Sequence, residues 1–147
     1  LRNYTELARR IIKNTDAYLV LTGTKQEEKD TKAISQTVNN KRCIDLTGRT
    51  TIKELIDLYN ISDILVSNDS GPPNFAALTK IKVIVLFGPE TPICYLQRSR
   101  NIKLVYSDLI CSPCVSAYNH RKSPCNDNKC MKAIKVDEIY GLLEEML

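Results

Sequence analysis

The chain contains no tryptophan, two phenylalanines among its 147 residues, and a single histidine, His120. It therefore has few of the rings on which proteins stack nucleic-acid bases. The 21 Lys and Arg residues exceed the 17 Asp and Glu residues by only four, and no block of basic residues occurs. Because nucleic-acid-binding proteins usually concentrate their positive charge on one face, we expect no nucleic acid among the partners of this protein.

Long apolar runs are also absent from the sequence. No stretch approaches the roughly 20 apolar residues that a membrane-spanning helix needs, and no secretory signal peptide opens the chain. The sequence begins with Leu1 rather than methionine, and its first residues have the pattern of a helix interior. We expect a fragment of a longer protein, whose 43% hydrophobic residues suffice for the core of one domain over residues 1–147.

Segments of helical periodicity alternate with short apolar runs along the chain. Helices are predicted over residues 4–13, 26–38, 52–59, 72–78 and 136–147, and strands over 17–21, 43–46, 64–66, 83–87 and 102–106. Strands that are almost continuously apolar and separated by helices predict an α/β fold, with a parallel sheet covered by helices on both faces. No G-x-G-x-x-G follows any of these strands, which argues against a NAD-dependent dehydrogenase.

Four predicted strands end in loops of small and polar residues, at 23–27, 46–51, 67–72 and 87–92. In a parallel sheet the carboxyl ends of the strands share the edge at which ligands bind. In the third loop, Ser70 and Gly71 lead into a predicted helix, whose free N–H groups and positive dipole end favour a phosphate. Asp69 would repel a bare phosphate, so we expect it to cap the helix or to accept from a hydroxyl. A plain capped turn is the alternative for this loop.

The order and spacing of these motifs resemble the C-terminal half of glycosyltransferase family 9, the ADP-heptose:lipopolysaccharide heptosyltransferases. The matching motifs are Leu46-Thr47-Gly48, Thr51-Ile52-Lys53-Glu54-Leu55, Val66-Ser67-Asn68-Asp69-Ser70-Gly71-Pro72 and Val85-Leu86-Phe87-Gly88-Pro89. The resemblance implies a GT-B architecture, in which two Rossmann-like domains face a cleft. This chain would be most of the C-terminal, donor-binding domain without its first strand.

The implied reaction transfers a heptose-like sugar from a nucleotide diphosphate sugar, with an ADP-sugar favoured, to lipopolysaccharide or another glycan. It needs no catalytic cofactor and would take place in the cytoplasm, at the inner membrane. The catalytic base would lie in the N-terminal acceptor domain of the same parent protein. We therefore assign no catalytic residue to this chain and expect it to be inactive alone.

Carried over by position, the resemblance implies donor-binding roles for eight residues: Glu27, Arg49, Thr50, Thr51, Asp69, Ser70, Gly71 and Asn74. Ser70 and Gly71 would contact the diphosphate, and Asp69 would hold the donor sugar or order the loop. Glu27 would lie near the ribose, or serve only as a first-turn helix acid. Residues 49–51 would lie near the base or ribose, or cap the next helix, for which Glu54 is placed to complete a capping box with Thr51.

Asn74 departs from the family, which usually has histidine in this segment. Asparagine can donate to a phosphate oxygen but cannot carry a charge. This difference leaves open an alternative function, a nucleotide- or sugar-binding module without catalysis.

Four of the six cysteines, Cys111, Cys114, Cys125 and Cys130, fall in a segment over residues 107–131 that we expect to be irregular. Four thiolates could close a structural zinc site, with His120 as a substitute ligand, while disulfides and free thiols are the alternatives. A zinc-stapled interaction domain is accordingly a second alternative function. Cys43, on a predicted strand, is expected in the core.

Overall fold

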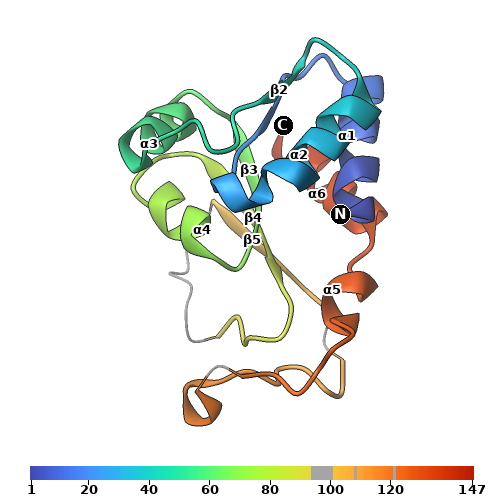
Figure 1. Ribbon diagram of the computed structural model, residues 1–147, viewed down its shortest axis with the longest axis vertical. Coiled ribbons are helices and arrows are strands. Elements are labelled where there is room, and N and C mark those ends of the chain that lie inside the picture. Colours follow the sequence, from blue (N-terminus) through green and yellow to red (C-terminus); the bar gives the residue numbers. More distant parts are fainter. Residues whose placement is uncertain (94–100, 108, 121) are drawn as a thin grey trace. The chain divides into compact units, whose positions relative to one another are not determined.

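The computed structural model describes residues 1–93, 101–107, 109–120 and 122–147 (Figure 1). In chain order the elements are α1 (Arg2–Asn14), β1 (Leu19–Leu21), the 3-10 helix η1 (Lys25–Glu27), α2 (Glu28–Val38), β2 (Cys43–Asp45), α3 (Ile52–Asn60), β3 (Ile64–Asn68), α4 (Gly71–Ala76), β4 (Lys82–Phe87), β5 (Ile102–Tyr106), η2 (Ala117–Asn119), α5 (Lys129–Ala133) and α6 (Val136–Met146). They form two compact units, unit 1 over residues 1–55 and unit 2 over residues 56–147. The alternation of helices and parallel strands confirms the α/β prediction.

Unit 1 is built on a parallel pair of strands, β1 and β2, whose register runs from Leu19 opposite Cys43 to Leu21 opposite Asp45. Helix α1 buries one apolar face and packs on α2. The guanidinium of Arg42 donates to the carbonyls of Ile12 at 2.7 Å and Thr15 at 2.6 Å, which ties the end of α1 to the start of β2. Cys43 is buried, as expected, and burial raises the pKa of its thiol.

Unit 2 contains a parallel sheet in the order β3-β4-β5. The central strand β4 is buried from Val83 to Phe87, because it has a neighbour on each edge and contacts α4, α5 and α6. Each fully buried side chain of this kind contributes roughly 1.5–3 kcal/mol to folding. The apolar face of α6 contributes to the same core with Val136, Ile139, Tyr140, Leu143 and Met146. This core fixes the carboxyl ends of β3 and β4, where the third and fourth loops begin.

The strands form two sheets in the described residues, where the sequence had suggested one. Among the described strands β1 pairs only with β2, and β3 pairs only with β4, so each keeps one unpaired edge. Hydrophobic periodicity shows which faces are buried, but it does not show which strands are neighbours.

No helix in the described ranges combines the length and the apolar character needed to cross a bilayer.

The cysteine-rich segment contains two short helical elements, η2 and α5, within the region expected to be irregular. These elements have three and five residues, too few for a helical period to show in the sequence.

Strand β3 continues to Asn68, two residues beyond its predicted end, because Ser67 and Asn68 pair in register with Val85 and Leu86 of β4.

Candidate functional site

The first two strand-end loops meet at the carboxyl edge of the sheet in unit 1, as predicted. The amide of Gly48 donates to the carbonyl of Gly23 at 2.9 Å, which joins the loop after β2 to the loop after β1. Gly48 has a φ of +69°, in the left-handed region, and a Cβ there would lie 3.2 Å from Cα of Lys25. Glycine at position 48 therefore allows the two loops to approach closely.

Glu27 closes a capping box at the end of the first loop. Its Oε2 accepts from the amide of Thr24 at 2.7 Å and from the Thr24 hydroxyl at 2.8 Å. The sequence prediction of a donor-binding carboxylate missed this box, although Thr-x-x-Glu is its usual signature. The carboxylate is exposed, so the box orients Glu27 at the edge of the sheet without burying it.

Thr51 and Glu54 form the predicted capping box at the start of α3. Oε2 of Glu54 accepts from the amide and the hydroxyl of Thr51, each at 2.8 Å, and the Glu54 amide donates to the Thr51 hydroxyl at 3.3 Å. These bonds lower the pKa of Glu54. The geometry thus gives Thr51 a structural role. Thr50 is half-buried beside it, and Arg49 is exposed.

Positive charge gathers beside these loops. Glu28 forms an ion pair with Lys32 at 2.7 Å. The pKa of Glu28 is lowered first by its hydrogen bond and charge interaction with Lys32, and further by the positive charges of Lys25 and Arg49. Lys25, which follows the Gly23-Thr24 turn directly, is a further candidate for contact with an anionic ligand. Its place two residues after Gly23, in the loop after a strand, was the sequence signal that could have identified it.

The third loop holds Asp69, Ser70, Gly71 and Asn74 together at the carboxyl end of β3, and all four are exposed. The amide of Asp69 donates to the carbonyl of Leu86 at 3.0 Å, which continues the pairing with β4 beyond the strand. The hydroxyl of Ser70 donates to the carbonyl of Asn68 at 3.2 Å rather than capping the helix. Helix α4 begins at Gly71, one residue before its predicted start.

The start of α4 offers fewer donors than the sequence prediction supposed. Pro72 and Pro73 occupy its second and third positions and carry no N–H. The Gly71 amide is therefore the one backbone donor of the first three helical residues. Asn74 uses its side-chain amide to donate to the carbonyl of Ser70 at 3.1 Å. A phosphate at this turn would depend on the backbone at Ser70 and Gly71 and on the remaining hydrogen of the Asn74 amide.

Gly71 is not required by the fold of the loop itself. A Cβ at this position would meet only Cε2 of Phe75, at an ordinary contact distance of 3.5 Å. A glycine that the chain does not need for its own packing is the feature expected where a ligand approaches the backbone.

The fourth loop is covered by the cysteine-rich segment. The carbonyl of Gly88 accepts from the Ser112 hydroxyl at 2.6 Å, and the carbonyl of Pro89 accepts from the amides of Cys114 and Val115 at 2.9 Å each. After this turn, the side chain of Glu90 is only 8% exposed, and it accepts from the Thr91 amide at 3.3 Å. Sequence reasoning did not single out Glu90, because burial of a loop carboxylate has no periodic signal.

The cysteines are free thiols throughout the described residues, while Cys94 lies outside them. In the described part of the chain, no group of three or more His, Cys, Asp or Glu side chains is arranged to hold a metal ion. The geometry therefore gives no support to the zinc site predicted at Cys111, Cys114, Cys125 and Cys130, which stays a prediction. His120 is exposed.

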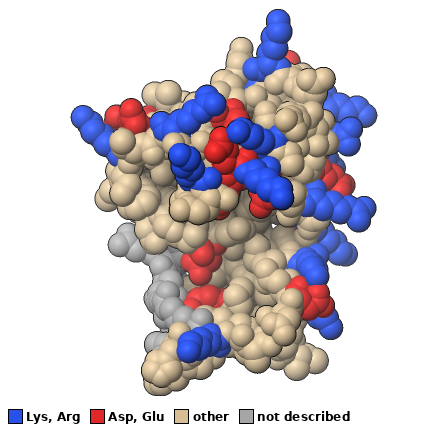
Figure 2. Space-filling model, in the orientation of Figure 1, with Lys and Arg blue, Asp and Glu red and all other residues tan. Residues whose placement is uncertain are grey.

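The charged side chains are mixed in sign on the face shown in Figure 2, where Lys and Arg lie among Asp and Glu. The excess of four positive charges therefore does not form a single basic patch on this face. Local charges such as those of Lys25 and Arg49, which act on the pKa of Glu28, decide where a ligand would meet positive charge.

Comparison with known proteins identifies similar sequences. The model of glycosyltransferase family 9 (heptosyltransferase) matches residues 1–123. The chain is 33% identical over 112 residues to lipooligosaccharide heptosyltransferase 2 of Campylobacter jejuni, which covers 74% of this chain and 33% of that protein. It is 29% identical over 93 residues to lipopolysaccharide heptosyltransferase 2 of Salmonella typhimurium, covering 61% of this chain and 26% of that protein. The chain thus spans about a third of the length of the curated relatives it matches.

Solved structures show the same fold. The structure of E. coli ADP-heptose LPS heptosyltransferase II matches 98% of this chain and 40% of its own, with a TM-score of 0.76 and 19% identity. A family 9 glycosyl transferase from Veillonella parvula matches with the same TM-score, coverage and 18% identity. These matches confirm the predicted Rossmann-like α/β fold.

Proposed function

Because the chain belongs to glycosyltransferase family 9, the heptosyltransferase family, we propose that it is the donor-binding part of a longer glycosyltransferase. The parent enzyme transfers a heptose-like sugar from a nucleotide diphosphate sugar, with an ADP-sugar favoured, to lipopolysaccharide or another glycan. The reaction takes place in the cytoplasm, at the inner membrane, where such an acceptor is assembled.

The observation that carries this proposal is the exposed turn at residues 69–71. It lies at the carboxyl end of β3, the end of a parallel strand at which ligands of such folds bind. Gly71 leaves the backbone open there, because among the described residues a Cβ would meet only the ring of Phe75, at an ordinary contact distance. We assign the donor diphosphate to the amides of Ser70 and Gly71 and to the side chain of Asn74.

The chemical task of this turn is to stabilise charge. Negative charge grows on the departing diphosphate as the glycosidic bond to the donor breaks, and donors already in place at that position lower the barrier. Asp69 would accept from a hydroxyl of the donor sugar, because a carboxylate repels phosphate and binds hydroxyl groups. The proton of the acceptor hydroxyl passes to a base in the N-terminal acceptor domain of the parent protein.

Within unit 1 itself, we propose the edge formed by the first two loops as a nucleoside-binding surface. The exposed carboxylate of Glu27 is fixed by its capping box and can accept from ribose hydroxyls. Arg49 and Lys25 supply positive charge near the adjacent Glu28, and Thr50 lies on the same loop as Arg49. Thr51 contributes by holding the start of α3.

A transfer assay tests the proposal. The parent protein, given an ADP-heptose donor and a heptose-accepting lipopolysaccharide core, should release ADP and extend the acceptor, while the 147-residue chain alone should release none. An Asp69→Asn substitution should reduce turnover by at least tenfold, if the carboxylate holds the donor sugar. Undiminished transfer by the variant would remove Asp69 from the site, and no transfer from any nucleotide sugar would contradict the proposal.

Asn74 favours one second candidate, a nucleotide- or sugar-binding module without catalysis. Its amide is partly used within the chain, on the carbonyl of Ser70, and it carries no charge for a diphosphate. Nucleotide binding by the parent protein without any sugar transfer would select this candidate.

A further inference from the structure

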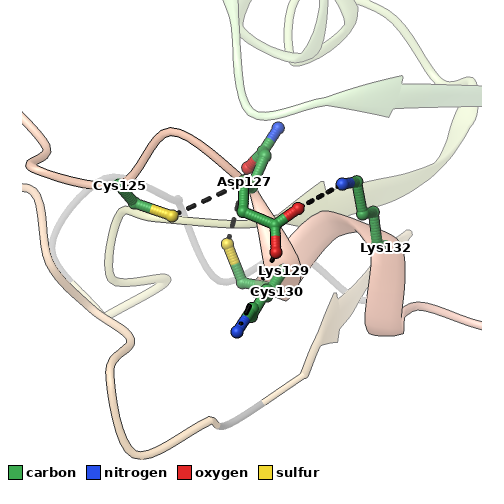
Figure 3. Close-up of polar contacts among 6 residues, drawn as sticks. Cys125, Asp127, Lys129, Cys130 and Lys132 are labelled. Carbon is green, nitrogen blue, oxygen red and sulfur yellow. Dashed lines mark hydrogen bonds and ion pairs between the residues drawn. The ribbon is translucent and has the colours of Figure 1, made fainter.

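Two cysteines outside the proposed donor site, Cys125 and Cys130, contact the same residue. The sulfur of Cys125 accepts from the backbone amide of Asn128 at 3.3 Å. The thiol of Cys130 donates to the side-chain oxygen Oδ1 of Asn128 at 3.6 Å. Figure 3 shows both sulfur atoms facing the turn that carries Asp127. The two thiols thus lie at one short turn, separated by four residues of sequence.

The turn itself is held by a network of charges. The carboxylate of Asp127 forms an ion pair with Lys132 and a longer one, at 3.9 Å, with Lys129 (Figure 3). These pairs tie the residues before α5 to the body of that helix. Cys125 and Cys130 are therefore presented from a structured turn, although much of the surrounding segment is irregular.

The two thiols differ in exposure and in acidity. Cys125 is exposed, and the backbone amides of Asp127, Asn128 and Lys129 lower the pKa of its thiol. Cys130 is 6% exposed, and burial raises the pKa of its thiol. An exposed sulfur and a buried sulfur that both contact Asn128 have the arrangement of an attacking and a resolving cysteine.

We propose that Cys125 and Cys130 form a thiol–disulfide exchange site for a low-molecular-weight disulfide, a site separate from the donor-binding loops. The Cys125 thiolate attacks one sulfur of the small disulfide, whose S–S bond breaks, and one small thiolate leaves. Cys130 then loses its proton to solvent, and its sulfur attacks the Cys125 sulfur of the mixed disulfide. The second small thiolate leaves. The protein dithiol is oxidised to one disulfide, and the small disulfide is reduced to two thiols.

We assign the resolving role to Cys130, because its sulfur and that of Cys125 contact the same residue, Asn128. The sulfur of Cys114 is engaged with the hydroxyl of Ser123 at 3.1 Å, whereas that of Cys130 shares Asn128 with the attacking sulfur. The Cys130 sulfur also lies 3.4 Å from the position of a Cβ on Gly88.

The test uses the full 147-residue chain, reduced and then treated with glutathione disulfide, with acid quenching and peptide mass spectrometry. We expect a Cys125–Cys130 disulfide and two released glutathiones per chain. Cys130→Ser should accumulate glutathione on Cys125, because the second step is lost. Cys125→Ser should slow the reaction by roughly tenfold or more and leave Cys130 unmodified. Cys111→Ser is the matched control, an exposed cysteine of the same segment, and should react like the unaltered chain.

Three results would overturn the proposal. Glutathione that first accumulates on Cys111 or Cys114 would place the reactive thiol elsewhere. A disulfide from Cys125 to Cys114 would identify a different resolving residue. A zinc ion that co-purifies with the chain and blocks the reaction until it is chelated would make the cysteines a metal site. Because the first two results are read from the unaltered chain, they do not depend on whether a variant folds.

Discussion

The hydroxyl of Tyr59 is buried without a hydrogen-bond partner, one of three such side-chain atoms in the described residues. The residue is 3% exposed, and burial raises its pKa to about 12. A buried polar group without a partner opposes folding. Tyr59→Phe should therefore leave the free energy of unfolding unchanged or raise it by about 1 kcal/mol, as measured by urea denaturation.

Tyr106→Phe provides the comparison for this prediction. The hydroxyl of Tyr106 donates to the Ser112 hydroxyl at 3.2 Å, so its removal should cost about 1 kcal/mol. Equal losses in the two variants would mean that Tyr59 has a partner in solution.

The capping box of α3 predicts a dependence on pH. Glu54 has a lowered pKa in the folded chain, so its stabilising effect is fully present above the ordinary carboxyl pKa and is lost as the pH falls through the lowered value. Thr51→Ala removes the hydroxyl contact and should cost about 1 kcal/mol at neutral pH. The difference in free energy of unfolding between this variant and the unaltered chain should become smaller in acid. Thr50→Ala is the matched control, and a Thr51 effect that is constant from pH 7 to pH 3 would contradict this reading.

Asn74 tests the link between charge and donor affinity. Asn74→His in the parent protein should tighten binding of ADP by about fivefold below pH 6, where the imidazole is protonated, and less at pH 8. Isothermal titration at both pH values, with Asn74→Ala as the control, measures the effect. If affinity is the same for all three side chains, the diphosphate does not lie at this turn.

At the scale of elements, β4 and α5 are held together at Gly88. A Cβ at this position would lie 2.7 Å from both Cγ and Sδ of Met131, which is closer than side chains pack. Gly88→Ala should therefore lower the free energy of unfolding by about 1–3 kcal/mol, the usual cost of overpacking.

A second substitution separates the causes of this loss. Met131→Ala removes the clashing atoms. Gly88→Ala should therefore cost less free energy of unfolding in the Met131→Ala background than in the unaltered chain. Gly141→Ala in α6 is the control, because a Cβ there meets nothing within 4 Å. Failure of Met131→Ala to relieve the loss would place the constraint in the backbone of the turn.

Most elements of the fold could be predicted from the sequence. Apolar runs such as 83–87 and the last amphipathic helix agree with the structure to within a residue or two, because burial imposes a period on them. The Thr51–Glu54 box was predicted, because it has a local sequence signature. Sheet neighbours could not be predicted in the same way, because pairing depends on contacts distant in sequence.

Only part of the candidate site, likewise, could be predicted from the sequence. The turn at residues 69–71 could be predicted because Asp-Ser-Gly-Pro after a strand is a local pattern. The burial of Glu90 and the cover of Ser112 and Cys114 over the fourth loop could not be predicted, because both follow from the packing of a segment more than twenty residues away. The sequence shows that Pro72 and Pro73 carry no N–H. The effect on a phosphate at this turn is known only from the structure, which shows that α4 begins at Gly71.

At the scale of the whole molecule, we propose that the chain supplies one part of a larger enzyme. It spans about a third of the length of its curated relatives, while 98% of it matches a heptosyltransferase structure. The groups that our proposal needs for acceptor binding and for proton removal belong to the rest of the parent protein. Donor binding is the function that can be tested on this chain and on its parent together.

The most direct test is ligand-detected NMR of ADP, UDP and GDP, with this chain and with the parent protein. We predict that ADP binds the parent protein selectively and that Gly71→Ala weakens this binding by about tenfold or more, whereas Gly141→Ala leaves it unchanged. Binding by the parent but not by the short chain would still support the account and would show that the rest of the parent completes the site. Absence of binding in both, or equal binding by the Gly71→Ala variant, would contradict the assignment of the donor diphosphate to the Ser70-Gly71 turn.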